Sequence, residues 1–255
     1  MSPSPEADLE FLGVPAEDIP LVLAAPGGAE AQARCRELLE SDAPVAWPNV
    51  DGYFYVHVFL AALPAIRARH AELGVPDHVS RDTLADLGNK MAIYRRTHGV
   101  GGLDRQSWLV RHFRGTLYRL GRLQFDMLGS ALDVHIPEDG PLSMSSCDES
   151  FGAARPFFAR YFGRVYTTAV CRSWLLDRQL AAYLPETSNI IGFQRRFELT
   201  GPVEDGDHDI MEFVFRRHPA DLAGLPQRTA LERAIVAHLR AGGHWQITTG
   251  LTPLP

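Results

Sequence analysis

The sequence pattern changes just after residue 100, because residues that favour helices dominate before this point and strand signals begin after it. This order predicts a helical first part and a second part that contains the strands. In the first part, good helix formers and apolar residues at helical spacing predict helices over residues 29–41, 52–74 and 80–94. Pro64 is expected to kink the second of these helices and Gly74 to end it. The order of elements predicts an α+β protein, with a helical N-terminal domain over residues 1–105 and a sheet domain over residues 106–255.

The second part alternates between strand and helix signals. We expect strands over residues 115–127, 130–137, 164–174, 189–199, 210–217 and 244–250. Helices are expected over residues 104–113, 145–162, 177–184 and 228–241. The density of β-branched residues marks 164–174 as a buried strand, and Ser145 or Ser146 is suited to cap helix 145–162. These elements predict a mixed, antiparallel-rich sheet flanked by helices.

Composition places the chain among ordinary globular proteins, because 45% of its 255 residues are hydrophobic and 22% are charged. No window approaches the roughly 18 apolar residues of a membrane-spanning helix, and residues 1–8 lack the basic and apolar regions of a signal peptide. We therefore expect a cytoplasmic protein with no membrane partner. Three scattered cysteines, with no His-x3-His or Cys-x2-Cys spacing, predict neither a disulfide framework nor a metal site.

Positive charge is concentrated in residues 90–122, although the net charge of the chain is −6. This segment holds eight basic residues and one acidic residue. Such a segment suits a partner that carries phosphate. The alternative is a solvated face whose charges pair with the acidic N-terminal domain. Direct RNA binding is the weaker interpretation, because the segment has no series of aromatic residues for base stacking.

Several runs of the second part resemble one known family. They are HIPEDGPLS at 135–143, CDESFGAARPFFARYF at 147–162, CRSWLLDRQLAAYLPETSNIIGFQRRF at 171–197 and AGGHW at 241–245. These runs are similar to the GNAT-like C-terminal domain of bacterial acyltransferases, which in that family follows a helical N-acyltransferase N-terminal domain. The resemblance implies a GNAT-like mixed sheet flanked by helices. It also implies transfer of an acyl group from a thioester donor to an amine of a small-molecule acceptor.

The resemblance also implies where the donor binds. In GNAT folds the pantetheine arm lies between two splayed parallel strands, here 130–137 and 164–174, and the pyrophosphate lies at the N-terminus of the helix between them. Free N–H groups and the helix dipole favour an anion at that place. The residues expected to bind the donor there are Gly140, Ser143, Ser145 and Ser146; the serines are equally suited to cap the helix.

The glycine-rich phosphate loop of GNAT enzymes is missing before this helix. Its motif occurs instead at 96–101, after an expected helix, so we interpret that copy as an interdomain hinge and keep Arg96 as a second place for donor phosphate. The missing loop leaves three donors open: acyl-CoA, an acyl carrier protein and an aminoacyl-tRNA. No tightly bound cofactor is expected. The missing loop also leaves open the alternative that the protein is a non-catalytic module, which binds an acylated ligand or a protein partner.

His135 is the first choice for the base that takes a proton from the amine, since imidazole titrates near neutral pH. His244 is the second choice, and Tyr183 stands where GNAT enzymes often keep a tyrosine that protonates the leaving thiolate. The alternative for His135 is a half-buried histidine with no catalytic role, and the alternative for Tyr183 is an ordinary core aromatic residue. A nucleophilic Cys171 with His135 as its base is the least favoured, because a thiol on a buried strand is usually inert.

Further polar and aromatic residues lie near the ends of the expected strands. Ser173 is expected to take part in catalysis. The residues expected to line the substrate site are Trp174, Asp177, Asn189, Gln194, Arg196 and Trp245. Strand alternation would place Gln194 and Arg196 on one face, where an arginine suits a bidentate contact with a substrate carboxylate.

Overall fold

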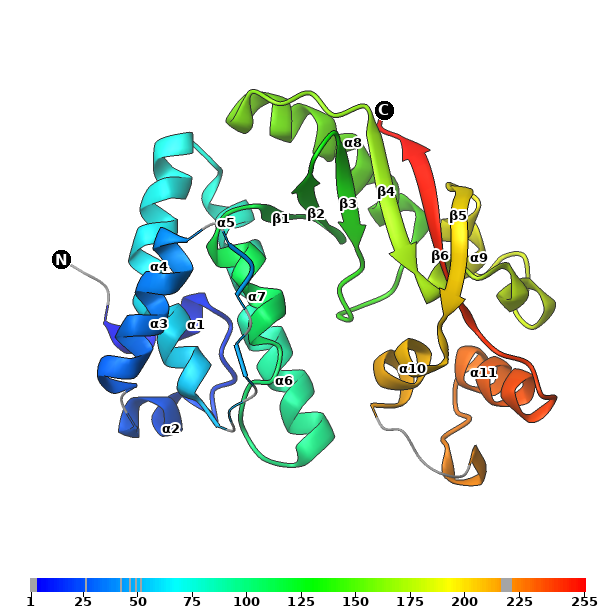
Figure 1. The fold of residues 1–255 in the computed structure, drawn as a ribbon, viewed down its shortest axis with the longest axis horizontal. Coiled ribbons are helices and arrows are strands. Elements are labelled where there is room, and N and C mark those ends of the chain that lie inside the picture. Colours follow the sequence, from blue (N-terminus) through cyan, green and yellow to red (C-terminus); the bar gives the residue numbers. More distant parts are fainter. Residues whose placement is uncertain are drawn as a thin grey trace. The chain divides into compact units, whose positions relative to one another are not determined.

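The structure, a computed structural model, describes residues 4–25, 27–41, 43–45, 47–48, 50, 52–216 and 222–255. The chain packs as two compact units. The first runs up to Met127 and includes Phe157–Arg164, and the second consists of Leu128–Pro156 and Val165–Pro255. Figure 1 labels the helices and strands.

Helices make up most of the first unit. They are α1 (Pro5–Phe11), α2 (Ile19–Ala24), α3 (Gly28–Glu40), α4 (Phe54–Leu73), α5 (Asp77–Leu84), α6 (Asp86–His98) and α7 (Gln106–Phe113). Aromatic side chains fill the core between α4 and α7, where the rings of Phe59 and Phe113 are 4.6 Å apart. Helix α4 continues through Pro64, and Gly74 ends it with a left-handed φ of 74°. The expected end of this helix is therefore confirmed.

A β-hairpin follows α7. Strand β1 (Leu117–Leu120) pairs antiparallel with β2 (Leu123–Leu128), and the register joins Leu120 to Leu123. The strand signals over 115–127 thus belong to two strands, because Gly121 takes a left-handed φ of 70° and turns the chain back on itself. Strand β1 also contacts α5, since the Arg119 N–H donates to Thr83 Oγ1 at 2.9 Å.

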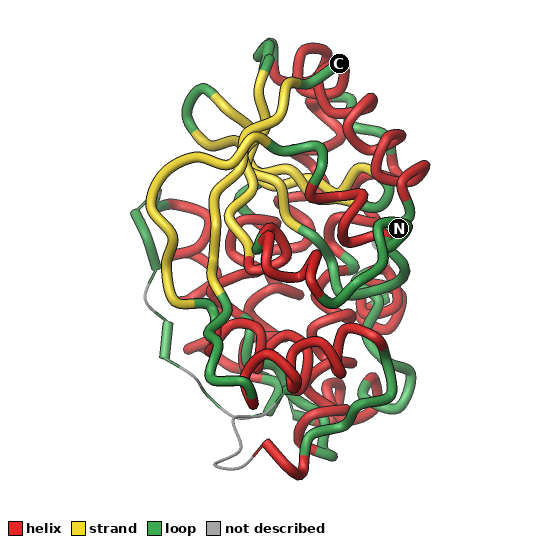
Figure 2. Tube along the Cα trace, turned by 90° about the vertical axis from the view of Figure 1, so that its right-hand side faces the viewer, coloured by secondary structure: helices red, strands yellow, loops and turns green. Residues whose placement is uncertain are grey.

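The strands form a mixed sheet in the order β1-β2-β3-β4-β6-β5 and are yellow in Figure 2. Strands β3 (Ala131–His135) and β4 (Thr168–Ser173) are parallel. Strand β6 (Gln246–Pro253) pairs antiparallel with both β4 and β5 (Glu198–Asp205). The expected architecture, a helical N-terminal region followed by a mixed sheet with flanking helices, is confirmed.

The helices of the second unit enclose a second apolar core. Helix α8 (Met144–Phe162) connects β3 to β4, and its last residues belong to the first unit. The other helical segments are η1 (Trp174–Leu176), η2 (Arg178–Ala182), α9 (Asn189–Gln194), α10 (Asp207–Ile210), η3 (Met211–Phe215, a π-helix), η4 (Leu222–Gly224) and α11 (Ala230–Arg240). Trp245 and Ile235 are fully buried in this core.

Two expected strands are helical instead. Residues 189–194 form α9, so the strand expected over 189–199 was wrong apart from its last two residues, which begin β5. The strand expected over 210–217 was also wrong: residue 210 ends α10 and residues 211–215 form a π-helix. Residue 217 lies outside the described residues. No helix within the described ranges is long and apolar enough to cross a membrane.

Candidate active site

The two strands expected to bracket the acyl donor are parallel neighbours. The register joins Leu132 to Ala169 and Asp133 to Val170, whereas β3 continues to His135 and β4 to Ser173. Both strands thus continue in the C-terminal direction beyond these two registered pairs. The family resemblance implies that the donor lies between these two strand ends.

His135 is the last residue of β3, two residues after Asp133. Because strand residues alternate between faces, the two side chains share one face of the sheet. His135 Nε2 is 3.3 Å from Asp133 Oδ2, and about a fifth of each side chain is exposed (22% and 21%). A carboxylate in this position orients an imidazole, which a general base requires.

Cys171 is buried on β4, where it pairs with Gly250 of β6. Burial, reinforced by the negative charge of Asp133, raises the pKa of its thiol far above the ordinary value. The thiol therefore stays protonated at neutral pH and does not supply a nucleophilic thiolate. This geometry favours direct attack of the acceptor on the donor over a covalent enzyme intermediate.

The N-terminus of α8 follows the β3 loop, as the donor site requires. Ser143 caps the helix, because its Oγ accepts from the Ser146 N–H at 3.3 Å and lies 2.6 Å from Ser146 Oγ. Ser145 is exposed beside them, 3.4 Å from Ser143 Oγ. Gly140, with a φ of 107°, stands in the loop with open space where a side chain would project. The capping role is observed, and the role in donor binding stays a prediction.

Arg196 lies at the same end of α8, which the expected strand did not predict. Its Nη1 is 2.6 Å from Asp148 Oδ1, and its Nη2 donates to the Met144 carbonyl oxygen at 3.3 Å. The hydrogen bond from Arg196 lowers the pKa of the Asp148 carboxyl group. A positive side chain thus stands beside the first turn of the helix, where it suits a phosphate as well as a carboxylate.

The polar residues that follow β4 mainly hold the local backbone. Ser173 Oγ accepts from the Leu175 N–H at 3.1 Å and so caps η1. The carboxylate of Asp177 is buried and accepts from the N–H groups of Gln179 at 2.9 Å and Gln246 at 2.8 Å. It therefore joins the turn after β4 to the start of β6. Trp174 is buried in the core of this unit.

Two further expected substrate residues lie on α9. Gln194 is buried, and its side-chain amide donates to the carbonyl oxygens of Leu175 at 2.8 Å and Asp177 at 2.9 Å. Its amide N–H groups are therefore engaged by the protein backbone. Asn189 is exposed at the first residue of the helix. Of these two side chains, only that of Asn189 is accessible to a substrate.

Tyr183 and His244 meet in a cluster around Trp245. Tyr183 Oη is 3.1 Å from Nδ1 of His238, a residue of α11, and 39% of Tyr183 is exposed. Trp245 is fully buried, with its ring 4.3 Å from that of His238. His244 is exposed; its Nδ1 lies 2.7 Å from Asp207 Oδ2, and this hydrogen bond raises the pKa of the imidazole. The phenol and the His244 imidazole are thus accessible, whereas the buried Trp245 ring packs against the rings of Tyr183 and His238.

The copy of the phosphate-loop motif at 96–101 lies at a helix C-terminus. Arg96 is exposed in the last turn of α6, and Gly99 ends that helix with its N–H bonded to the Arg95 carbonyl oxygen. Carbonyl groups, rather than N–H groups, are unpaired at such an end, so it does not favour an anion. Arg96 as a residue that binds donor phosphate stays a prediction.

Much of the positive segment 90–122 is paired with acidic side chains of the first unit. The ion pairs are Lys90–Asp86 (4.0 Å), Arg95–Glu17 (3.6 Å), Arg95–Asp18, Arg105–Asp104 (3.8 Å) and Arg111–Asp126 (3.1 Å). These pairs support the interpretation of the segment as a charged face matched to the acidic helical domain. Within the described residues, no group of three or more His, Cys, Asp or Glu side chains is arranged to hold a metal ion.

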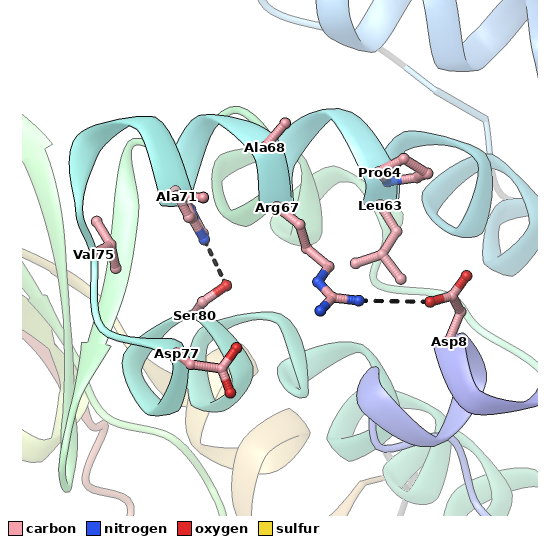
Figure 3. Close-up of a pocket in the computed structure, with 10 residues that line it drawn as sticks. Asp8, Leu63, Pro64, Arg67, Ala68, Ala71, Val75, Asp77 and Ser80 are labelled. Carbon is pink, nitrogen blue, oxygen red and sulfur yellow. Dashed lines mark hydrogen bonds and ion pairs between the residues drawn. The ribbon is translucent and has the colours of Figure 1, made fainter. Parts of the chain in front are cut away.

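The helical unit contains a groove of about 510 Å³ between α1, α4 and α5, shown in Figure 3. Arg67 Nη1 is 3.7 Å from Asp8 Oδ1 at one end of this groove. His70 Nδ1 is 2.8 Å from Ser80 Oγ at the other end, and both residues are buried. Each pair joins α4 to a neighbouring helix, so these polar groups stabilise the packing of the unit.

The comparisons with known proteins agree with this geometry. The model of the GNAT-like C-terminal domain matches residues 117–252, and that of the N-acyltransferase N-terminal domain matches residues 6–115. No curated protein sequence matches the chain.

Solved structures of acyltransferases resemble the whole chain. One, in complex with decanoyl-CoA and teicoplanin, is 42% identical, with a TM-score of 0.89 over 97% of this chain and 86% of its own. Another, in complex with CoA and 10C-teicoplanin, is 40% identical, with a TM-score of 0.91 over 100% and 88%. A variant acyltransferase in complex with octanoyl-CoA is 41% identical, with a TM-score of 0.90 over 97% and 86%.

The family models and the similar structures together identify the chain as an acyltransferase of the GNAT type. The chain belongs to the family that combines an N-acyltransferase N-terminal domain with a GNAT-like C-terminal domain.

Proposed function

We propose that this protein is an N-acyltransferase that moves an aliphatic acyl group from coenzyme A to an amine of a small-molecule acceptor. The observation that carries the proposal is the likeness, at 40–42% identity over nearly the whole chain, to acyltransferases in complex with octanoyl-CoA, decanoyl-CoA or CoA. Two of those complexes also contain teicoplanin or 10C-teicoplanin. An amine of a glycopeptide of that class is therefore the first acceptor to test.

The chemistry assigned to the site is direct attack. The amine nitrogen bonds to the thioester carbonyl carbon, the carbon–sulfur bond breaks, and one proton passes from nitrogen to sulfur. In our proposal His135, oriented by Asp133, accepts the amine proton. Tyr183 donates a proton to the thiolate, and backbone N–H groups at the splayed strand ends stabilise the oxyanion. The donor diphosphate binds at the N-terminus of α8, near Arg196.

A donor panel tests the proposal. We expect octanoyl-CoA and decanoyl-CoA to raise the melting temperature by several degrees, because a ligand at 100 times its Kd adds about 2.7 kcal/mol of stability. Release of free thiol on addition of the acceptor would then report transfer. The panel also includes an acyl carrier protein and an aminoacyl-tRNA. A thermal shift with only one of these would identify that molecule, rather than acyl-CoA, as the donor. No shift with any donor would favour a non-catalytic binding module.

Replacement of His135 by asparagine tests the base. We expect kcat to fall by roughly 100-fold, because general base catalysis typically contributes that much or more, while the thermal shift with octanoyl-CoA is retained. His208→Asn is the matched control, since 77% of the His208 side chain is exposed on α10. An unchanged kcat in the His135 variant would remove this residue from the mechanism.

A further inference from the structure

The imidazole of His238 is held on both of its nitrogens. Nε2 lies 3.3 Å from the carbonyl oxygen of His244, and Nδ1 lies 3.1 Å from Tyr183 Oη. A carbonyl oxygen only accepts hydrogen bonds, so Nε2 carries its hydrogen whether the ring is neutral or protonated. Any change in the protonation of His238 therefore takes place at Nδ1, which faces the phenol.

The surroundings leave the ring little freedom. The ring of Trp245 packs against it at 4.3 Å, and a β-carbon added at Gly243 would lie 2.5 Å from both Cε1 and Nε2 of His238. Only glycine at position 243 permits this orientation. Among the described residues, the titratable or charged neighbours include His244, which is paired with Asp207, and Arg240, two residues further along α11.

We propose that His238 is a positioning residue and proton reservoir that acts through Tyr183 during release of the thiolate. This inference rests on the proposed function. When Nδ1 is protonated, it donates to the phenol oxygen and leaves the phenol O–H directed at the sulfur. The phenol proton then bonds to sulfur as the Nδ1 proton moves to the phenol oxygen, which leaves neutral Tyr183 and a neutral imidazole. Solvent supplies the next proton to Nδ1.

The protonated ring is the active form, because only a protonated Nδ1 can donate to the phenol oxygen and pass it a proton. Trp245 supports the active form, since an aromatic face attracts a cation.

His238→Asn separates proton transfer from positioning, because the asparagine amide N–H can donate to the Tyr183 phenol oxygen but does not give up its proton. With octanoyl-CoA and the acceptor, we expect kcat to fall about 100-fold and KM for the donor to stay within about twofold. Gly243→Ala, which displaces the ring, should lower kcat in the same way. His208→Asn is the control and should keep the wild-type kcat. A His238→Asn variant with wild-type kcat, or with a raised donor KM as its only change, would overturn the proposal.

Nitrogen-15 NMR of the wild-type protein tests the pair without turnover. We expect Nε2 of His238 to carry the hydrogen of the neutral ring, with the Nδ1 shift altered in Tyr183→Phe. An Nδ1-protonated neutral ring, or a ring indifferent to Tyr183, would overturn the inference. A wild-type protein with no transferase activity would instead count against the proposed function, and the NMR result would still decide the assignment of the pair.

Discussion

Replacing Gly88 with alanine is expected to destabilise the helical unit by at least about 3 kcal/mol, which is the upper range for overpacking a core. Gly88 lies in α6, and its N–H donates to the Leu12 carbonyl oxygen at 3.0 Å. An added β-carbon would lie 1.8 Å from the carbonyl oxygen of Gly13 and 2.1 Å from its carbonyl carbon. Both are backbone atoms and cannot rotate away, so α6 would have to move off the end of α1.

Urea unfolding followed by circular dichroism measures this effect, and Gly152→Ala is its matched control. Gly152 lies inside α8, and no atom is within 4 Å of the β-carbon that alanine would add. That variant should gain about 0.5–1 kcal/mol, because glycine inside a helix is less favourable than alanine by this amount. A Gly88→Ala protein as stable as wild type would show that the two backbones do not approach so closely in solution.

The elements around the donor site could be predicted from the sequence because local and tertiary preferences agree there. Helix α8 begins beside the expected caps, with Ser143 as the residue that caps it. Strands β3 and β4 have the β-branched and alternating residues of buried strands, and they are parallel neighbours as the family resemblance implied. Where the chain has one preferred local structure and the core requires the same one, the sequence suffices.

The stretch 189–197 shows why other parts could not be predicted. Ile and Phe residues favour a strand by composition, but Ile191, Gln194 and Phe197 are all buried, which is a spacing of three and suits a helical turn. A buried glutamine is invisible to a search for apolar periodicity. Its amide is engaged by the carbonyl groups of residues 175 and 177, a contact that only the tertiary fold creates.

The candidate site was predictable residue by residue only in part. The sequence singled out Tyr183 and His135, whose side chains have polar partners in the structure. It did not single out His238, because the partner of that residue is 55 positions away and an isolated histidine near the end of a helix carries no motif. Arg196 was expected on a strand face, but its side chain lies at the N-terminus of α8. This prediction failed because residues 189–194 form helix α9 rather than a strand.

The stability of the helical unit is expected to fall by about 2.5 kcal/mol between pH 7.5 and pH 4.5, because His70 is folded in its neutral form. The side chain is 1% exposed, packs 5.2 Å from the ring of Tyr118 and is bound to Ser80. Burial, with a smaller contribution from the charge of Arg69, lowers the pKa of the imidazole from 6.5 to about 4. Between these two values the unfolded chain binds a proton that the folded chain does not, so stability is complete above pH 6.5 and is lost as pH falls towards 4.

His70→Asn isolates this contribution, since the asparagine oxygen can still accept the Ser80 hydroxyl but does not titrate. The variant should be less stable than wild type at pH 7.5, where it loses packing against Tyr118, and the difference should close or reverse by pH 4.5. His78→Asn is the control, because His78 is exposed on α5 and should leave the pH dependence unchanged. Carboxylates whose pKa values are lowered, such as that of Asp148, titrate in both proteins and cancel in the difference. Urea unfolding at one-unit pH steps measures this difference in stability. Parallel curves of stability against pH for wild type and His70→Asn would show that this imidazole is accessible to protons in the folded state.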